Sequence, residues 1–131
     1  MKNIFRTGDT KIYTKVVTEA EVAAFHGMVL HRVFSTFSLA RDFEWASRQF
    51  FIDMKDDDEE GVGTFLSIDH KNPAFVGEKI TFTATVEKIE RNELICNIEA
   101  KAGHRIIATG KTGQKMLKNE KLIQLLKPPA P

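Results

Sequence analysis

Hydrophobic and polar positions alternate with period two through most of the second half of the chain. Within residues 79–89, Ile80, Phe82, Ala84 and Val86 fall on one face of a strand, and threonines fall on the other. Short breaks rich in glycine, proline or asparagine separate such segments. The pattern predicts four strands in an antiparallel meander, at residues 62–70, 79–90, 93–103 and 105–116.

A longer apolar stretch without glycine or proline runs from residue 34 to residue 52. Its apolar residues cover most of the circumference of a helix, and Ser35 or Thr36 can cap the first turn. We therefore expect one long, largely buried helix here. Residues 11–17, near the start of the chain, are β-prone and predict a further strand.

The segment between this first strand and the long helix predicts two smaller features. Thr18 and Glu21 have the spacing of a capping box, which favours a short helix at about 19–25. Residues 26–33 carry no clear period, and Gly27 indicates a loop that moves or turns sharply. We interpret this loop as a candidate lid.

Two further stretches are polar. Residues 53–61 contain six acidic residues and one lysine, which predicts a solvated connection after the helix. Their spacing lacks the central glycine and the terminal glutamate that a calcium-binding loop needs. Residues 118–131 predict a short amphipathic C-terminal helix, ended by a pair of prolines, and then a tail.

A single helix that is apolar nearly all round, followed by a long sheet, favours a sheet that wraps around the helix. This α+β architecture is the hotdog fold: an antiparallel β-sheet wrapped around one long central α-helix. We expect a single domain over residues 1–131, with its core at about 11–117. One sheet around one helix leaves the helix and a sheet edge partly uncovered, which argues for a homodimer that could pair further into a tetramer.

Length and charge narrow the possible functions. The chain has 131 residues, which fits one domain, with 42% hydrophobic and 28% charged residues. Its formal net charge is only +1, so no strong electrostatic attraction favours binding to nucleic acid. No apolar run approaches the roughly 20 residues that cross a bilayer, and the first residues lack the apolar stretch of a secretory signal. We expect a cytoplasmic protein that binds neither nucleic acid nor membranes.

The single cysteine, Cys96, falls on the apolar face of the third sheet strand, where a free thiol usually acts as a small hydrophobe. It has no intramolecular partner for a disulfide, and there is no second thiol for a zinc site. His26, His31 and His104 show no ligand spacing. No metal site is expected.

Three polar residues stand out against the apolar background. Glu44 lies in the middle of the long helix between Phe43 and Trp45, where a buried carboxylate would need a partner or a raised pKa. Thr36 lies eight residues earlier, so the two side chains are about 12 Å apart along a helix axis and could flank one substrate without touching. His70 ends the first sheet strand and could move a proton near neutral pH.

Each of these residues also has a structural interpretation. Thr36 could simply cap the helix, beside amide groups that also suit an oxyanion. Glu44 could pair with Arg41 or Arg48, its neighbours at i−3 and i+4. His70 could be an ordinary strand-end histidine.

Taken together, four short motifs resemble the fluoroacetyl-CoA thioesterase-like family of the hotdog superfamily, with the family's spacing from Thr to Glu and from Glu to His. The motifs are Val33-Phe34-Ser35-Thr36, Phe43-Glu44-Trp45-Ala46, Gly61-Val62-Gly63-Thr64 and Ile68-Asp69-His70. The resemblance covers about residues 15–117. It implies hydrolysis of an acyl-CoA thioester at a dimer interface, without a metal or an organic cofactor.

The resemblance also implies roles for particular residues. Thr36, Glu44 and His70 match the family's catalytic triad, and Gly63 matches an active-site glycine. Phe37 follows the threonine where the family often has a small residue, which would narrow the acyl slot. The expected substrate-binding set consists of Gly63, Phe37 and Phe34.

Other departures concern charge and the lid. Arg41 and Asp42 bring charge to a helix segment that is more apolar in the family, and residues 25–33 do not match its apolar, proline-containing lid. The identity of the acyl group therefore stays open. So does the choice between attack by water and an acyl-enzyme route.

Two alternatives to a thioesterase use the same fold. The first is an acyl-CoA-binding module without turnover. The second is a hydratase or dehydratase using Asp69 with His70, which is disfavoured because adjacent strand residues face opposite sides. Basic residues on the strand rim are candidates for holding the CoA phosphates: Lys71, Arg105, Lys111 and Lys115.

Overall fold

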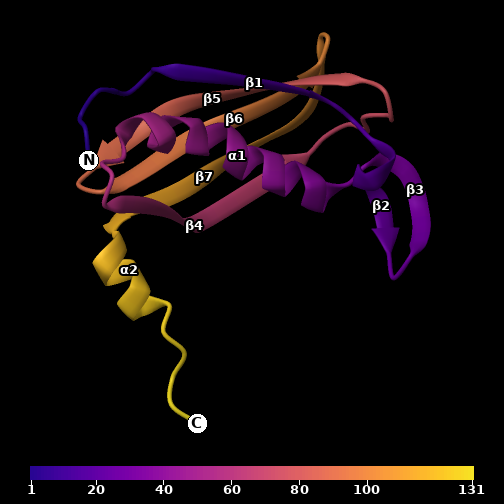
Figure 1. The fold of residues 1–131 in the computed structure, drawn as a ribbon. Coiled ribbons are helices and arrows are strands. Elements are labelled where there is room, and N and C mark those ends of the chain that lie inside the picture. The colour runs from indigo at the N-terminus through magenta and orange to yellow at the C-terminus, as the bar shows by residue number, and fades with distance from the viewer.

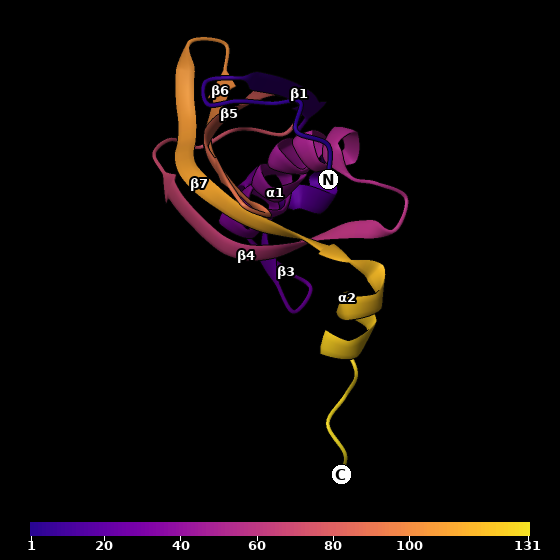
Figure 2. The same cartoon turned by 90° about the vertical axis from the view of Figure 1, so that its left-hand side faces the viewer.

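A computed structural model describes all of residues 1–131 (Figure 1). Five antiparallel strands form the main sheet, and helix α1 lies in its concave side, as the end-on view in Figure 2 shows. The strands, in their order across the sheet, are β1 (Thr10–Val16), β5 (Lys79–Glu90), β6 (Glu93–Ala102), β7 (Arg105–Lys118) and β4 (Glu59–His70). Helix α1 spans Thr36–Met54. The predicted α+β fold, a sheet wrapped around one long helix, is confirmed.

The predicted meander is wrong for one strand. Strands β5, β6 and β7 follow one another through tight hairpins, but β4 pairs with β7 rather than with β5. Strand β5 already has β1 and β6 as neighbours, so β4 can pair only at the far edge. Gly110 of β7 permits this pairing, because a Cβ there would lie 1.9 Å from the carbonyl oxygen of Ser67.

The predicted helix at 19–25 and the loop at 26–33 are also different in the structure. One 3-10 turn, η1 (Glu19–Glu21), is followed by a hairpin of β2 (Val22–Phe25) and β3 (Met28–Phe34). The side chain of Glu21 accepts a hydrogen bond from the backbone N–H of Thr18, as a capping box requires. His26 and Gly27 both have positive φ, 52° and 78°, so they form the turn of a two-residue hairpin.

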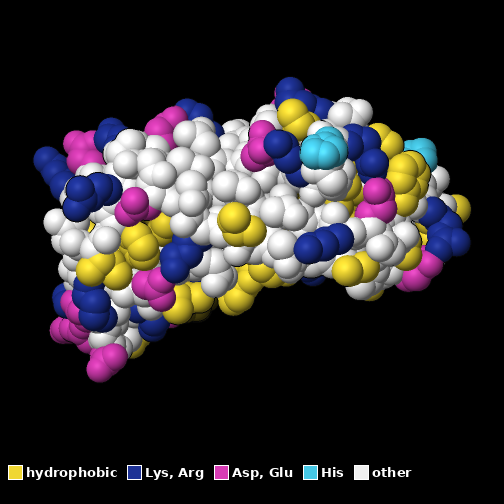
Figure 3. Space-filling view, turned by 90° about the horizontal axis from the view of Figure 1, so that it is seen from above, with side chains coloured by type: hydrophobic (Ala, Val, Ile, Leu, Met, Phe, Trp, Pro, Cys, Tyr) yellow, Lys and Arg dark blue, Asp and Glu magenta, His cyan; other side chains and the backbone are white.

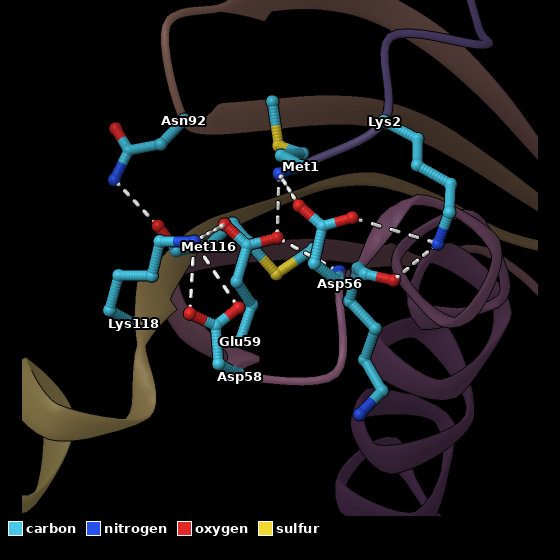
Figure 4. A network of polar contacts seen from close by, with 9 residues as sticks. Met1, Lys2, Asp56, Asp58, Glu59, Asn92, Met116 and Lys118 are labelled. Atoms are coloured by element: carbon cyan, nitrogen blue, oxygen red, sulfur yellow. Dashed lines mark hydrogen bonds and ion pairs between the residues drawn. The ribbon is translucent and has the colours of Figure 1, made fainter.

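The acidic stretch after α1 is shorter and less solvated than predicted. The helix continues to Met54 and β4 begins at Glu59, whose side chain is buried. The amino group of Met1 lies 2.5 Å from the carboxylate of Asp56 and 2.7 Å from that of Glu59, within the network in Figure 4. These hydrogen bonds lower the pKa of both carboxyl groups. The amino group therefore offsets the cost of burying Glu59.

The core lies between α1 and the sheet. Phe43 of the helix meets Phe82 of β5 edge to face, with 6.1 Å between the ring centroids. The alternation predicted for β5 is confirmed, because Ile80, Phe82 and Ala84 are buried and the threonines between them face outward.

The surface seen from above in Figure 3 has a broad uncharged middle, with charged side chains mostly toward its two ends.

Cys96 is fully buried in this core, as the sequence predicted. Burial raises the pKa of its thiol to about 12. We therefore expect the native protein to resist a disulfide reagent such as DTNB at pH 8 and to react with one equivalent after unfolding in guanidinium. Rapid reaction of the native protein would show that the core opens easily.

Some apolar side chains of α1 remain uncovered. Phe37 and Trp45 are 50% and 43% exposed, and the edge strand β4 is exposed from residue 63 to residue 67. The C-terminal helix α2 (Asn119–Leu125) has no buried residue and projects beyond β4 in Figure 1. No helix combines the length and the apolar character that crossing a bilayer requires.

Candidate active site

The start of α1 and the end of β4 bring Thr36 and His70 together. Ser35 caps the helix, since its hydroxyl accepts a hydrogen bond from the N–H of Ser38. Thr36 is therefore the first helical residue, and its own hydroxyl is free of the capping role. That hydroxyl lies 2.9 Å from Nδ1 of His70, to which it can donate or from which it can accept.

The second ring nitrogen of His70 is unusual. Its Nε2 is buried and has no hydrogen-bond partner in the chain. A buried polar atom without a partner is costly, and in native proteins such atoms are rare. The histidine therefore has one nitrogen within hydrogen-bond distance of Thr36 and a second one that is buried and unpaired within the chain.

Glu44 is exposed rather than buried, which corrects the expectation of an apolar setting. Neither of its neighbours pairs with it. Arg41 donates to Glu21 and Arg48 donates to Glu60, each at 2.7 Å. The carboxylate of Glu44 is thus free of the structural ion pairs that the sequence left open.

Gly63 of β4 lies beside this carboxylate. A Cβ at Gly63 would stand 3.7 Å from Oε1 of Glu44, so the glycine leaves the strand backbone accessible next to it. The structure thus forms two pairs, Thr36 with His70 and Glu44 with Gly63. No hydrogen bond or ion pair links them, and Thr36 and Glu44 are about 12 Å apart along the helix axis.

A cavity of about 300 Å³ opens at Glu44. Two arginines, Arg41 and Arg48, line it together with Gln114, and Trp45 is its one hydrophobic lining residue. No group of three or more His, Cys, Asp or Glu side chains has an arrangement that could hold a metal ion.

Gln114 was not singled out from the sequence. It occupies an inward position of β7, between buried Thr112 and Met116. A polar residue at an inward position of a strand could have marked it in the sequence as a residue that needs a hydrogen-bond partner. Its side-chain amide donates to the hydroxyl of Ser47 at 2.8 Å and to the backbone carbonyl of Glu44 at 3.3 Å. It therefore ties the middle of α1 to the sheet beneath the cavity.

Replacing Gln114 with alanine is expected to lower the free energy of unfolding by about 1–3 kcal/mol, because a buried donor and its two contacts are lost. Denaturant unfolding measures this. Gln49→Ala is the matched control: its amide donates to the carbonyl of Trp45 on the helix surface, so its loss should cost less than about 0.5 kcal/mol. Equal effects would show that Gln114 does not hold the helix.

The two phenylalanines of the expected substrate-binding set lie in different environments. Phe37 is exposed and meets Phe25 of the β2–β3 hairpin edge to face, with the ring centroids 5.5 Å apart. Phe34 is 0% exposed and packs in the core, so its side chain offers no surface to a ligand. The hairpin thus contacts the first turn of α1 through this pair of rings, next to Thr36.

Other predicted groups are engaged elsewhere. Asp69 pairs with Lys71 at 2.9 Å and is exposed, which gives no support to a shared pocket with His70. Arg105 pairs with Glu78. Of the four basic residues on the strand rim, Lys111 is also paired, with Glu87, and Lys115 makes no ion pair.

Comparison with known families identifies the fold and the chemistry. The family model for fluoroacetyl-CoA-specific thioesterases (FlK) matches residues 17–120, most of the chain. This chain belongs to that family. Members are thioester hydrolases, so this protein is one too. The resemblance read from the four sequence motifs is confirmed.

Solved structures share the fold over nearly the whole chain. A Thermus thermophilus hypothetical protein of the thioesterase superfamily is 26% identical, with a TM-score of 0.89 over 94% of this chain and 91% of that one. The fluoroacetyl-CoA thioesterase FlK is 21% identical, with a TM-score of 0.82 over 95% and 98%. A hot-dog-like protein from Thermanaerovibrio acidaminovorans is 20% identical, with a TM-score of 0.85 over 93% and 90%. A comparison with curated protein sequences gave no significant match.

Proposed function

We propose that this protein hydrolyses acyl-CoA thioesters at a site shared between two copies of the chain. Thr36 and His70 of one copy would act with Glu44 and Gly63 of the other. The observation that carries this proposal is that the two pairs form separately within one chain. Each pair keeps a polar group that makes no hydrogen bond or ion pair within that chain: Nε2 of His70 and the carboxylate of Glu44.

The edge strand β4 supports such a dimer. It pairs with β7 on one side only, and Phe65 and Leu66 are exposed at its middle. An unprotected strand edge with apolar residues favours pairing with another strand. In a two-fold dimer the two β4 strands would run antiparallel, so the region of Gly63 in one copy would approach the region of His70 in the other.

The chemistry follows from the residue types. Glu44 would take a proton from water, whose oxygen attacks the thioester carbon, or would attack that carbon itself to give an anhydride that water then opens. The free amide groups at the start of α1 suit the oxyanion. The C–S bond breaks, and the imidazolium form of His70 would deliver its proton to the departing CoA thiolate. The proton that water releases would then restore the imidazolium. Thr36 would hold the imidazole or bind the carbonyl oxygen.

The test is the release of free CoA from a panel of short and medium acyl-CoAs, measured with a thiol reagent. Cys96 does not interfere, since it is buried. We expect release by the wild type and loss of release in His70→Ala, with His104→Ala as the control because His104 lies in the β6–β7 turn. A rise in melting temperature with acyl-CoA but no release would favour the binding module instead.

A further inference from the structure

Two hydrogen bonds fix the orientation of the Gln114 side chain. Its Nε2 donates to the hydroxyl of Ser47 at 2.8 Å and to the backbone carbonyl of Glu44 at 3.3 Å, which uses both protons of the amide nitrogen. The opposite orientation would place the amide oxygen against that carbonyl oxygen, with no proton between the two acceptors. The amide oxygen, Oε1, therefore takes no part in holding α1 to the sheet.

This oxygen is a free acceptor at the cavity. Three buried side-chain atoms of the chain lack a hydrogen-bond partner. Oε1 of Gln114 is not one of them, although it too makes no hydrogen bond within the chain. It is therefore open to solvent, and Gln114 lines the cavity of about 300 Å³ at Glu44. A carbonyl oxygen accepts hydrogen bonds and donates none, so it can hold an O–H group.

Gly63 leaves space beside both Gln114 and Glu44. It is the partner of Gln114 in the pairing of β4 with β7. Side chains of directly opposite strand residues extend to the same face, with Cβ atoms about 4.5–5.5 Å apart. A Cβ at Gly63 would also stand 3.7 Å from Oε1 of Glu44. The position that a side chain of residue 63 would fill thus borders both groups, and the cavity has room there for a water molecule, which occupies about 30 Å³ in the liquid.

We infer that Gln114 is a catalytic residue that holds, together with Glu44 of the same copy, the water molecule that attacks the thioester. This inference rests on the proposed function and assigns a further residue to it. Glu44 takes one proton of the water, Oε1 of Gln114 accepts a hydrogen bond from the other O–H group, and the water oxygen forms a bond to the thioester carbon. The C–S bond then breaks, and the CoA thiolate takes its proton from His70.

Competition between water and methanol tests this role. Water has one O–H group for Glu44 and a second for Gln114, whereas methanol has only one. Gln114→Met keeps the length of the side chain but has no amide oxygen, so we expect kcat to fall about tenfold or more while KM changes less than about twofold. In the presence of methanol, the ratio of methyl ester to free acid should rise about tenfold above that of the wild type, because only water loses a contact.

Mass spectrometry of the acyl products measures this ratio. A ratio equal to that of the wild type overturns the inference even where kcat falls, because a merely structural role of Gln114 would slow both reactions alike. No release of CoA by the wild type contradicts the proposed function itself.

Ser47→Ala is the matched control. It removes the same 2.8 Å hydrogen bond from the amide nitrogen but leaves the amide oxygen in place. It should therefore lower the free energy of unfolding without changing the ratio of methyl ester to free acid. A rise in the ratio as large as that of Gln114→Met would contradict a direct contact between Gln114 and the water molecule.

Gly63→Ala is the second test, because it breaks no hydrogen bond of Gln114. Gly63 has no positive φ, and a Cβ there lies at an ordinary contact distance from Glu44, so the variant should fold with an unchanged melting temperature. The added methyl group takes the place of the water molecule, and kcat should fall about tenfold or more. Full activity of this variant would contradict a water molecule at this position.

Discussion

Replacing Glu44 with glutamine is expected to reduce kcat/KM for acyl-CoA hydrolysis by about a hundred- to ten-thousand-fold, the range found when an acid or base group is removed. The substitution keeps the size of the side chain but removes its ability to accept a proton or attack a carbonyl. Because the carboxylate is exposed and makes no ion pair, the free energy of unfolding should change by less than about 0.5 kcal/mol. Free CoA release and denaturant unfolding measure the two quantities.

Asp53→Asn provides the control on the same helix. Asp53 is also a carboxylate of α1, but it pairs with Lys11 at the surface, far along the helix from Thr36. Its loss should leave hydrolysis unchanged. If Glu44→Gln kept full activity, or lost activity only because the protein unfolded, Glu44 would have no direct part in the reaction.

A mixed dimer of two inactive variants should have activity that neither variant has as a homodimer. If the site combines His70 of one copy with Glu44 of the other, a dimer of one Glu44→Gln chain and one His70→Ala chain contains one intact site and one doubly damaged site. Its activity should be about half that of the wild-type dimer. Co-expression with two different affinity tags, followed by purification on both, gives this mixed dimer for the CoA-release assay.

The matching control combines substitutions of two residues that the same chain contributes to one site. A mixed dimer of Thr36→Ala and His70→Ala chains has no intact pair of these residues, because both come from one chain, where they lie 2.9 Å apart. It should stay inactive. Recovery in this control, or none in the first mixed dimer, would contradict a site shared between copies. A protein that remains monomeric at micromolar concentration would contradict it as well.

The hydrophobic pattern alone was sufficient to predict several elements. The alternation in β5 and β6 and the uninterrupted apolar stretch of α1 predicted those elements to within about two residues, and Cys96 lies on the predicted core face. These features depend on the local backbone period, which is 2 in a strand and 3.6 in a helix, so the identity of nearby residues is enough. The motifs around Thr36, Glu44 and His70 likewise indicated the family before any contact was known.

Other features depended on contacts between distant segments. The pairing of β4 with β7, and the burial of Glu59 beside the amino group of Met1, join residues that no local pattern relates. The β2–β3 hairpin was missed because a capping box and a turn glycine describe its ends but not its pairing partner. Tertiary hydrogen bonding can override such local signals.

The same distinction applies to the candidate site. The sequence determined which residue types were present and at what spacing along the chain, and hence the class of chemistry. Only the tertiary structure decided that Thr36 meets His70, that Glu44 is exposed beside Gly63 instead of paired with an arginine, and that Gln114 lies beneath it. These are contacts between a helix and a curved sheet. Their geometry depends on how the whole sheet twists around α1, which no single segment of the sequence specifies.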